Sequence, residues 1–494
     1  MAKRICVIGA GPAGLCFAHA AAHQGLEVEL FEGHSKPGGS ASFFRRKTPA
    51  GVACFDAGAT VLWGMRNEED LLTKLFKKWQ INGLEFISHN QLQCSLSPSD
   101  HITLDSNSPE AWVRSLELAF PNENRELWKG MRQLSLQAQR LNELLSSGPH
   151  APLEDLNSAI FNLRLIPKIL PLSIEVITGL KHSFSSKLDD WHASARFRRW
   201  VDMNLLITLQ DTSQNVHPLY AALALFFYPL GAGSVKGGMF QFFDSLKREL
   251  NNNAKVHMRN PVLGIEKQNG HFLVRTKEEL HEPFDIVVSS IPRFNTQDLF
   301  GNEKIDDHSW EKQRTKVWGA LVGYLVIKDN PRLPNAPFNH HAYCEKKGEF
   351  YFSFSQRGDE VRAPIGYRTV TFSTHSLLSD WTGESSSYAE LKVERGSLGL
   401  KVFSERFPEV EVIFKEYGTP KTFERYTKRK EGFVGGLPLN YDNTFFNSPS
   451  IRTKIPNLYQ IGDTSFPGQS VFGCAVGALL CLEKITGHRQ FPKD

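Results

Sequence analysis

Three glycines near the start of the chain have the spacing of a phosphate-binding loop. The loop has the pattern G-x-G-x-x-G and consists of Gly9, Ala10, Gly11, Pro12, Ala13 and Gly14. In such a loop the first glycine allows a tight turn, the second lets the backbone approach a pyrophosphate, and the third lets a helix pack closely on a strand. Glu32 follows 18 residues after Gly14, where its carboxylate can accept hydrogen bonds from ribose hydroxyls. These residues predict a dinucleotide site, with a purely structural glycine turn as the alternative.

The segments around the loop are the ones that such a site needs. Residues 5–8 form a short apolar run typical of a buried parallel strand. An Ala-rich helix begins at the loop and ends at Gly25, and a second strand then ends at Glu32. The free N–H groups and the partial positive charge at the start of the helix would face the phosphates.

A second glycine-rich loop follows the second strand, and another short glycine-containing segment comes after it. The residues of these segments that we expect at the site are Gly38, Gly39, Ser40, Gly58, Ala59 and Thr60. A simple NAD-binding domain has no need of a second glycine-rich loop at this point. Two loops at one sheet edge instead suit a larger ligand that lies extended along the edge.

The N-terminal stretch resembles the flavoprotein superfamily that includes amine oxidases and phytoene desaturases. This resemblance implies FAD as the cofactor and extends to two further parts of the chain. Gly462 and Asp463 match the C-terminal FAD motif, in which the aspartate hydrogen-bonds the ribityl and pyrophosphate region. The helix after Gly473 would direct its N-terminus at the pyrimidine edge of the flavin and stabilise the anionic reduced form. Val262 matches a valine that contacts the adenine through its backbone.

One residue departs from the pattern of this superfamily. An arginine often follows the Gly-Gly pair directly, and this chain has Ser40 there. Arg45 or Arg46 could replace that contact, or backbone N–H groups alone could hold the phosphates. A solvated turn is the other interpretation of residues 45–47. We interpret the charged run "KRKE" at 428–431 as a solvated turn as well.

Two later stretches narrow the resemblance. Residues 418–438 and 352–376, together with "FPGQSVFG", resemble the carotenoid desaturase and isomerase branch, nearest to the carotenoid 3′,4′-desaturase type. The resemblance implies hydride transfer from an apolar polyene or isoprenoid to flavin N5, which needs no metal and no side-chain nucleophile. Redox-neutral isomerases, ketolases and polyene saturases share these motifs. An amine oxidase and a non-catalytic flavin-binding scaffold are further alternatives, and we assign no catalytic side chain.

The predicted fold is α/β, with a Rossmann-like FAD-binding domain assembled from three sequence segments. A mixed β-sheet substrate domain and a helical lid or membrane-contact subdomain complete it. The expected FAD-binding segments are 1–66, 236–295 and 455–494. The expected substrate-domain segments are 67–110 and 296–454, and the helical subdomain is expected at 111–235.

A histidine pair and an aromatic run could have a role in metal binding or substrate binding. His340 and His341 could ligate a metal, but neighbours on a strand point to opposite faces, and a polar loop is favoured. We predict no metal site. The aromatic run at 350–354 could line a substrate tunnel, although core packing is the default for such residues.

Bulk properties point to an intracellular protein of more than one domain. The 494 residues exceed what one core usually supports. A net charge of +4 does not indicate nucleic acid but suits an anionic membrane surface. Seven cysteines without a C-x-x-C pair read as reduced thiols, and the first residues run straight into a strand, so we expect a cytoplasmic protein. Oligomeric state is not predicted.

The segment 156–180 is the candidate for membrane contact. Arg164 and Lys168 share a helical face among apolar residues, and Pro167 and Pro171 should kink or break the helix. A basic, apolar and broken helix suits the membrane interface, and a lid packed on its own protein is the alternative. No run in the sequence approaches the roughly 18 apolar residues of a membrane-spanning helix, so peripheral association is expected.

Overall fold

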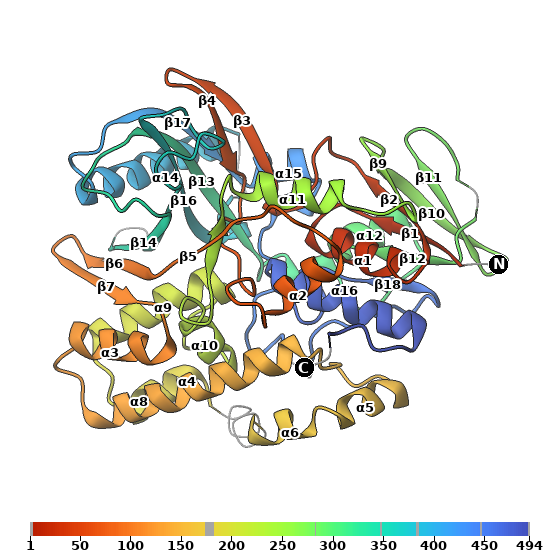
Figure 1. The fold of residues 1–494 in the computed structure, drawn as a ribbon, viewed down its shortest axis with the longest axis horizontal. Coiled ribbons are helices and arrows are strands. Elements are labelled where there is room, and N and C mark those ends of the chain that lie inside the picture. Colours follow the sequence, from red (N-terminus) through yellow and green to blue (C-terminus); the bar gives the residue numbers. More distant parts are fainter. Residues whose placement is uncertain are drawn as a thin grey trace.

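The computed structural model describes residues 3–172, 182–281, 283–345, 348–381, 385–444 and 447–492. Two large β-sheets, three two-stranded sheets and a layer of helices make up the described part of the molecule (Figure 1). The first sheet has five strands, all parallel to their neighbours. In spatial order these strands are β18 (Leu458–Gln460), β12 (Ile286–Ser289), β1 (Arg4–Ile8), β2 (Glu27–Glu32) and β9 (Ala254–Met258). Segments from the start, middle and end of the chain therefore meet in one sheet, which confirms the predicted Rossmann-like fold.

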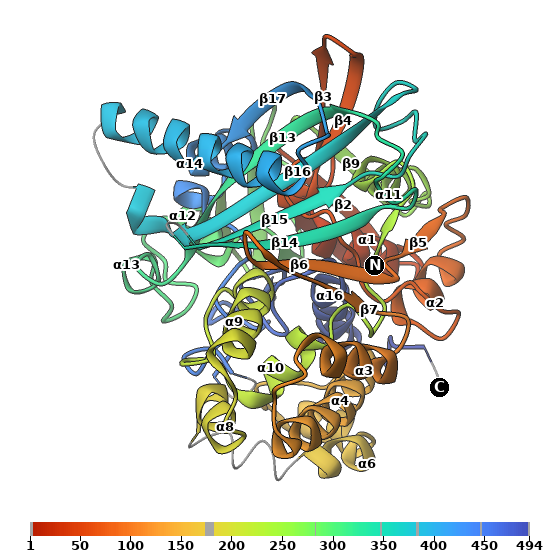
Figure 2. The same cartoon turned by 90° about the vertical axis from the view of Figure 1, so that its left-hand side faces the viewer.

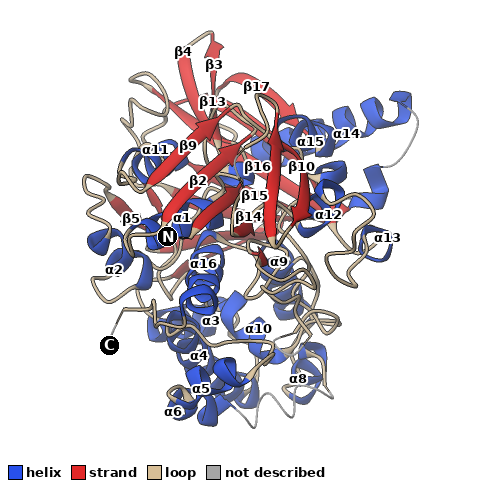
Figure 3. Cartoon of the chain, turned by 90° about the vertical axis from the view of Figure 1, so that its right-hand side faces the viewer, coloured by secondary structure: helices blue, strands red, loops and turns tan. Residues whose placement is uncertain are grey.

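Both faces of this parallel sheet are covered, and this explains the unbroken apolar run of β1. Ile5 and Val7 pack on the side of α1 and α16, while Cys6 and Ile8 pack against the β10–β11 hairpin. Figure 3 shows α1 and α16 beside the sheet. The elements that flank the sheet are α1 (Pro12–Ala22), α2 (Leu71–Lys78), α11 (Met239–Arg248), β10 (Val262–Gln268), β11 (His271–Thr276), α12 (Arg293–Leu299) and α16 (Val471–Thr486).

The second sheet has seven strands and is mixed, because only β6 and β14 run parallel. Its spatial order is β17 (Val412–Gly418), β13 (Trp318–Lys328), β16 (Tyr367–Leu377), β15 (Gly348–Phe354), β14 (Phe338–Cys344), β6 (Gln91–Ser97) and β7 (Asp100–Asp105). α14 (Ser385–Arg406) lies across one face (Figure 2). Phe350, Phe352 and Phe354 alternate along β15 and pack with Phe403 of α14, so the aromatic run is core.

Short elements connect the two sheets. The remaining strands are the hairpin β3 (Phe43–Thr48) and β4 (Gly51–Asp56), and the pair β5 (Phe86–Ser88) and β8 (Gly233–Val235). The remaining connecting helices are α13 (Trp310–Gln313) and α15 (Pro420–Thr427), with the 3₁₀ turns η1 (Gly39–Ala41), η2 (Leu170–Leu172), η3 (Leu378–Trp381) and η4 (Lys430–Gly432). Residues 45–47 lie in β3, so their interpretation as a turn is wrong.

A helical layer lies beside β6 and β7 (Figure 2). Its helices are α3 (Pro109–Ala119), α4 (Arg125–Ser146), α5 (Leu156–Leu163), α6 (Ile166–Ile169), α8 (Phe184–Asp190), α9 (Ala195–Leu209) and α10 (Pro218–Leu225). The predicted break in the 156–180 segment occurs between α5 and α6, because α5 ends at Leu163 and α6 begins at Ile166, with Pro167 in its first turn. Residues 173–180 lie outside the described residues. Within the described ranges, no helix is long and apolar enough to cross a bilayer.

Candidate cofactor site

The first glycine-rich loop joins β1 to α1 at the carboxyl edge of the parallel sheet. Gly9 has a φ of +97°, and its N–H donates to the carbonyl of Phe31 at 2.8 Å. A Cβ on Gly14 would lie 2.0 Å from the carbonyl oxygen of Gly9, so a side chain cannot fit there. A Cβ on Gly11 would instead meet open space, with no atom of the described residues within 4 Å. The loop is thus closed toward the sheet and open on its other side.

The first turn of α1 offers hydrogen-bond donors to an anion. Gly11 is the N-cap, so no side chain caps this turn, and Pro12 occupies the first helical position. Ala13 is buried in the same turn. The backbone N–H groups of a helix N-terminus lack intrahelical partners, and the helix dipole favours negative charge there.

Glu32 ends β2 beside this loop, and backbone donors hold its carboxylate. The N–H of Ala10 donates to Oε2 at 2.7 Å, and the N–H of His34 donates to Oε1 at 2.7 Å. Burial raises the pKa of the Glu32 carboxyl, and these backbone N–H groups oppose that shift. The N–H of Asn260 donates to the carbonyl of Glu32, which brings Val262 close to the end of β2.

The second loop and the segment after β4 pack against the first loop. The residues concerned are Gly38, Gly39, Ser40, Gly58, Ala59 and Thr60. A Cβ on Gly39 would lie 3.5 Å from the Cα of Gly11. A Cβ on Gly58 would lie 2.6 Å from the carbonyl oxygen of Ser40, so this contact requires glycine. The structure places Gly38, Gly39, Ser40 and Gly58 beside the first loop, and the carbonyl of Thr60 accepts a hydrogen bond from Ser234.

The C-terminal segment completes the cluster. A Cβ on Gly462 would lie 4.0 Å from the Cβ of Ala13, so the turn after β18 faces the start of α1. Asp463 follows in this turn, with about a fifth of its side chain exposed. Gly473 lies in the first turn of α16, and its N–H donates to the Ser470 side chain at 2.9 Å. The start of α16 is therefore capped by its own chain, unlike the start of α1.

Arg429 lies beside Asp463 at the cluster, in a stretch where the sequence analysis predicts a solvated turn. Its Nη1 donates to Oδ2 of Asp463 at 2.9 Å, and its Nε donates to the carbonyl of Phe433 at 2.8 Å. The guanidinium also stacks 4.2 Å from the centre of the Phe433 ring. Only 6% of Arg429 is exposed, so the prediction of a solvated turn at 428–431 is wrong for this residue. The glycine pair that follows also packs against this turn, because a Cβ on Gly436 would lie 2.1 Å from the carbonyl oxygen of Asp463.

The two arginines expected to replace the missing one are engaged elsewhere. Arg46 pairs with Glu416, Nε to Oε2, at 2.7 Å. The Arg45 guanidinium lies over the ring of Phe240, 4.9 Å from its centre. Both contacts belong to the β3–β4 hairpin and its neighbours.

The cluster has the unsatisfied donors and the open space that a dinucleotide requires. Among the described residues, the buried Ser40 Oγ and Arg429 Nη2 have no hydrogen-bond partner. Buried polar atoms are usually hydrogen-bonded in native proteins, and the oxygens of a bound dinucleotide would satisfy both of these. Together with the open side of Gly11 and the uncapped α1, they fit the phosphates and ribityl hydroxyls of FAD.

Two adjacent histidines of the second sheet are buried. His340 and His341 lie in β14, so the prediction of a polar loop is wrong. Nε2 of His340 lies 2.8 Å from Oγ of Ser95, and Nε2 of His341 lies 3.1 Å from the hydroxyl of Tyr228. Burial lowers the pKa of His341 to about 3 and that of His375 to about 4. In the described part of the chain, no group of three or more histidine, cysteine or acidic residues could hold a metal ion.

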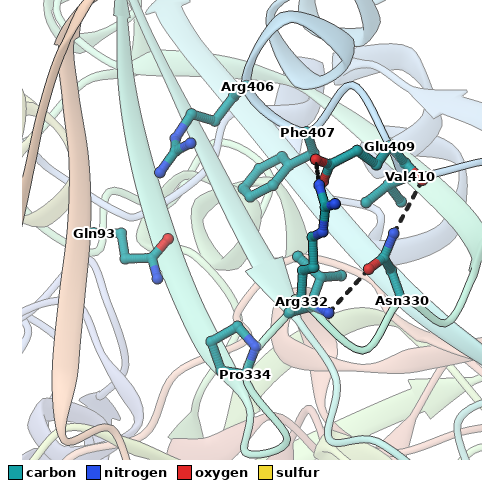
Figure 4. Close-up of a pocket in the computed structure, with 9 residues that line it drawn as sticks. Gln93, Asn330, Arg332, Pro334, Arg406, Phe407, Glu409 and Val410 are labelled. Carbon is teal, nitrogen blue, oxygen red and sulfur yellow. Dashed lines mark hydrogen bonds and ion pairs between the residues drawn. The ribbon is translucent and has the colours of Figure 1, made fainter.

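A cavity of about 170 Å³ opens away from this cluster, between β6, the loop after β13 and the end of α14 (Figure 4). Gln93 and Arg406 line one side of it, and Arg332, which pairs with Glu409, lines the other. Its described lining includes none of the predicted cofactor residues, and two arginines do not suit an apolar substrate. This cavity is therefore not the candidate site.

The parallel sheet and the loop cluster have the features of a dinucleotide-binding α/β fold. A protein-family model described as an NAD(P)-binding Rossmann-like domain matches residues 7–79. An oxidoreductase from Methanosarcina mazei has a TM-score of 0.62 at 17% identity, covering 97% of this chain and 100% of that one. Putrescine oxidase, in a complex with putrescine, has a TM-score of 0.61 at 14% identity over 99% and 100% of the two chains. At these identities the solved structures show the fold alone.

Three curated relatives align with nearly the whole of this chain. Chloroplastic prolycopene isomerase of Arabidopsis thaliana is 23% identical over 97% of this chain and 82% of its own. 4,4'-Diapolycopene oxygenase of Methylomonas sp is 23% identical over 99% of both chains. The zeta-carotene-forming phytoene desaturase of Myxococcus xanthus is 23% identical over 98% of this chain and 94% of its own. The chain is a distant relative of carotenoid isomerases, oxygenases and desaturases.

Proposed function

We propose that this chain is an FAD-dependent enzyme that acts on a long apolar polyene, with desaturation as the leading reaction. The observation that carries the proposal is the convergence of three distant chain segments, with unsatisfied buried donors, at one edge of the parallel sheet. The carotenoid relatives supply the substrate class. When bound, the flavin would accept or return a hydride at N5.

The chain's own residues would bind and orient the cofactor. The proposed FAD-binding residues are Gly9, Gly11, Pro12, Ala13, Gly14, Glu32, Gly38, Gly39, Ser40, Gly58, Ala59, Thr60, Val262, Gly462, Asp463 and Gly473. In this assignment the open loop at Gly11 and the start of α1 receive the diphosphate. Glu32 accepts the ribose hydroxyls, and the backbone near Val262 meets the adenine. Asp463 meets the ribityl chain.

The predicted division of the chain follows from the same assignment. We assign segments 1–66, 236–295 and 455–494 to the cofactor side, because the parallel strands belong to them. We assign 67–110 and 296–454 to the substrate side, because the strands of the mixed sheet belong to these. Residues 111–235 form the helical part in this division.

A redox-neutral polyene isomerase is the second candidate. The similarity to prolycopene isomerase, which extends over 97% of this chain, favours it. Reaction at the 3′,4′ bond is the most detailed part of this proposal. The position of the polyene against the flavin would determine which bond reacts. Ketolation and saturation are further reactions of the same substrate class, and an amine oxidase is a further candidate from the sequence resemblance.

We also propose that the protein takes its substrate from a membrane surface through α5 and α6. Leu156, Ile160 and Leu163 recur at helical spacing on α5 and are exposed by 76%, 47% and 61%. This face points away from the protein rather than onto it, which favours a membrane interface over a packed lid. Arg164 lies beside the apolar face and is exposed, so it can approach anionic lipid headgroups.

The test is to express the protein in a host that produces polyenes and to analyse the extracted pigments. A product with a longer conjugated chromophore supports desaturation, and a changed cis–trans pattern at constant mass supports isomerisation. A Gly11→Val variant is the matched control, because its side chain would fill the open side of the loop. Pigments that are the same with wild type and with Gly11→Val contradict the proposed function.

A further inference from the structure

Arg429 joins the substrate-side sheet to the cofactor cluster. It follows α15, which packs against the 3₁₀ turn η1 of the second glycine loop. On its other side it pairs with Asp463, at the turn after β18. We propose that Arg429 donates hydrogen bonds to the diphosphate of the bound dinucleotide and so completes the cofactor site. This inference rests on the proposed FAD function.

The first argument is the count of donors on the guanidinium. An arginine carries five N–H groups. Nε–H is used by the carbonyl of Phe433 and one Nη1–H by Asp463, at 2.8 Å and 2.9 Å. Nη2 is buried and has no partner among the described residues. Burying such donors without an acceptor is unfavourable, and phosphate oxygens would satisfy them.

The second argument is location, because the neighbours of Arg429 belong to the phosphate-binding part of the cluster. Asp463, the partner of Arg429, directly follows Gly462, where a Cβ would lie 4.0 Å from the Cβ of Ala13 in the first turn of α1. The Arg429–Asp463 pair therefore lies close to the start of α1. The diphosphate, rather than the flavin ring, is the part of FAD that meets these elements.

The third argument is geometric. The guanidinium is held on two edges, by Asp463 and by Phe433, so it is oriented before the ligand arrives. A planar guanidinium matches two phosphate oxygens at once, which a short neutral side chain such as Ser40 cannot do. Arg45 and Arg46 are held in contacts of the β3–β4 hairpin. Of these three arginines, only Arg429 combines near-complete burial with unpaired donors.

The test is to measure the affinity of the apo-protein for FAD and for ADP-ribose, which contains the diphosphate but no flavin. Arg429→Gln should weaken both ligands by a similar factor, about 10- to 150-fold, as expected for lost hydrogen bonds to a charged group. Arg429→Lys keeps the charge and should lose less. Arg425→Gln removes an exposed arginine from neighbouring α15 and should leave both affinities unchanged. The melting temperature of each apo-variant shows whether it is folded.

A further pair of variants separates ligand contact from structural support. Arg429→Gln leaves Asp463 unpaired, so the same substitution is repeated in the Asp463→Asn background. A loss of ADP-ribose affinity that persists there supports the proposal, and a loss that disappears contradicts it. Weaker FAD binding with unchanged ADP-ribose binding would assign Arg429 to the flavin and overturn the proposal. A wild-type protein that binds neither ligand refutes the proposed cofactor itself, and this inference with it.

Discussion

Glu32→Gln should not behave as a conservative substitution at this site. The N–H of Ala10 and the N–H of His34 each donate to a different carboxylate oxygen of Glu32, both at 2.7 Å. A glutamine amide has one oxygen and one NH₂ group. One of the two backbone donors would therefore face another donor. Because Ala10 is fully buried, its N–H has no access to water as a replacement.

The size of the effect follows from these contacts. A hydrogen bond to a charged group contributes about 1.5–3 kcal/mol, and an unsatisfied buried donor costs about 1–3 kcal/mol. We expect the apo-protein to melt at a lower temperature than wild type. If the carboxylate also accepts a ribose hydroxyl, the Kd for FAD should rise about 10- to 150-fold. Glu32→Ala removes all of these acceptors and should weaken FAD binding at least as much.

The assay is a titration of apo-protein with FAD, followed by flavin fluorescence. Glu27→Gln is the matched control, since Glu27 is an exposed glutamate on the same strand and lies outside the cluster. It should bind FAD as wild type does. A Glu32→Gln protein with a lowered melting temperature but an unchanged Kd would show that the carboxylate braces the loop without contacting the ribose. That result would refute this part of the assignment.

Three further predictions concern pH dependence, membrane binding and polyene turnover. Because burial raises the pKa of Glu32 in the apo-protein, FAD affinity should be full above that raised pKa and fall as the pH drops through it; Glu32→Gln should abolish this dependence in the titration. Ile166→Glu combined with Leu170→Glu should reduce flotation with anionic liposomes, since both side chains are exposed on or beside α6. Gly473→Val should lower polyene turnover more than His375→Ala does, with FAD occupancy measured in each, because a pKa of about 4 makes that imidazole a weak base.

Controls decide two of these predictions. Leu118 and Leu136 are exposed by 83% and 55% on other helices, so their double substitution by glutamate should leave flotation unchanged. An equal loss of flotation in both double variants would contradict a specific membrane contact. For Gly473, a Cβ would lie 2.8 Å from the carbonyl oxygen of Gly468, so the loop before α16 must shift. Normal turnover in fully loaded Gly473→Val, beside an inactive His375→Ala protein, would contradict the prediction that the space at Gly473 matters more for turnover than His375.

The sequence predicts the parts of the fold that local pattern determines. The β1–α1–β2 unit follows from an apolar run, a glycine loop and an Ala-rich helix, and the structure contains it. The joining of β12 and β18 to β1 depends on pairing between distant segments, and only the resemblance to a known family indicated it. Local periodicity carries no information about such pairing.

The errors fall where tertiary contacts override local composition. Arg429 lies in a charged run typical of a solvated turn, yet it is buried and pairs with Asp463, which lies beyond this run in the turn after β18. His340 and His341 are polar residues for which a loop was predicted, yet both are buried in β14, where their Nε2 atoms lie within hydrogen-bond distance of the side chains of Ser95 and Tyr228. In each case the partner is distant in sequence, so composition alone could not identify it.

The most direct test of the central claim is to mix FAD-loaded protein with a polyene in liposomes, without oxygen, and to record the flavin spectrum and the pigments together. The account predicts one of two results. Oxidised flavin is bleached as a more conjugated polyene forms, or pre-reduced flavin stays reduced while the polyene changes its cis–trans geometry. No change in flavin or pigment with either oxidised or reduced protein would contradict the account.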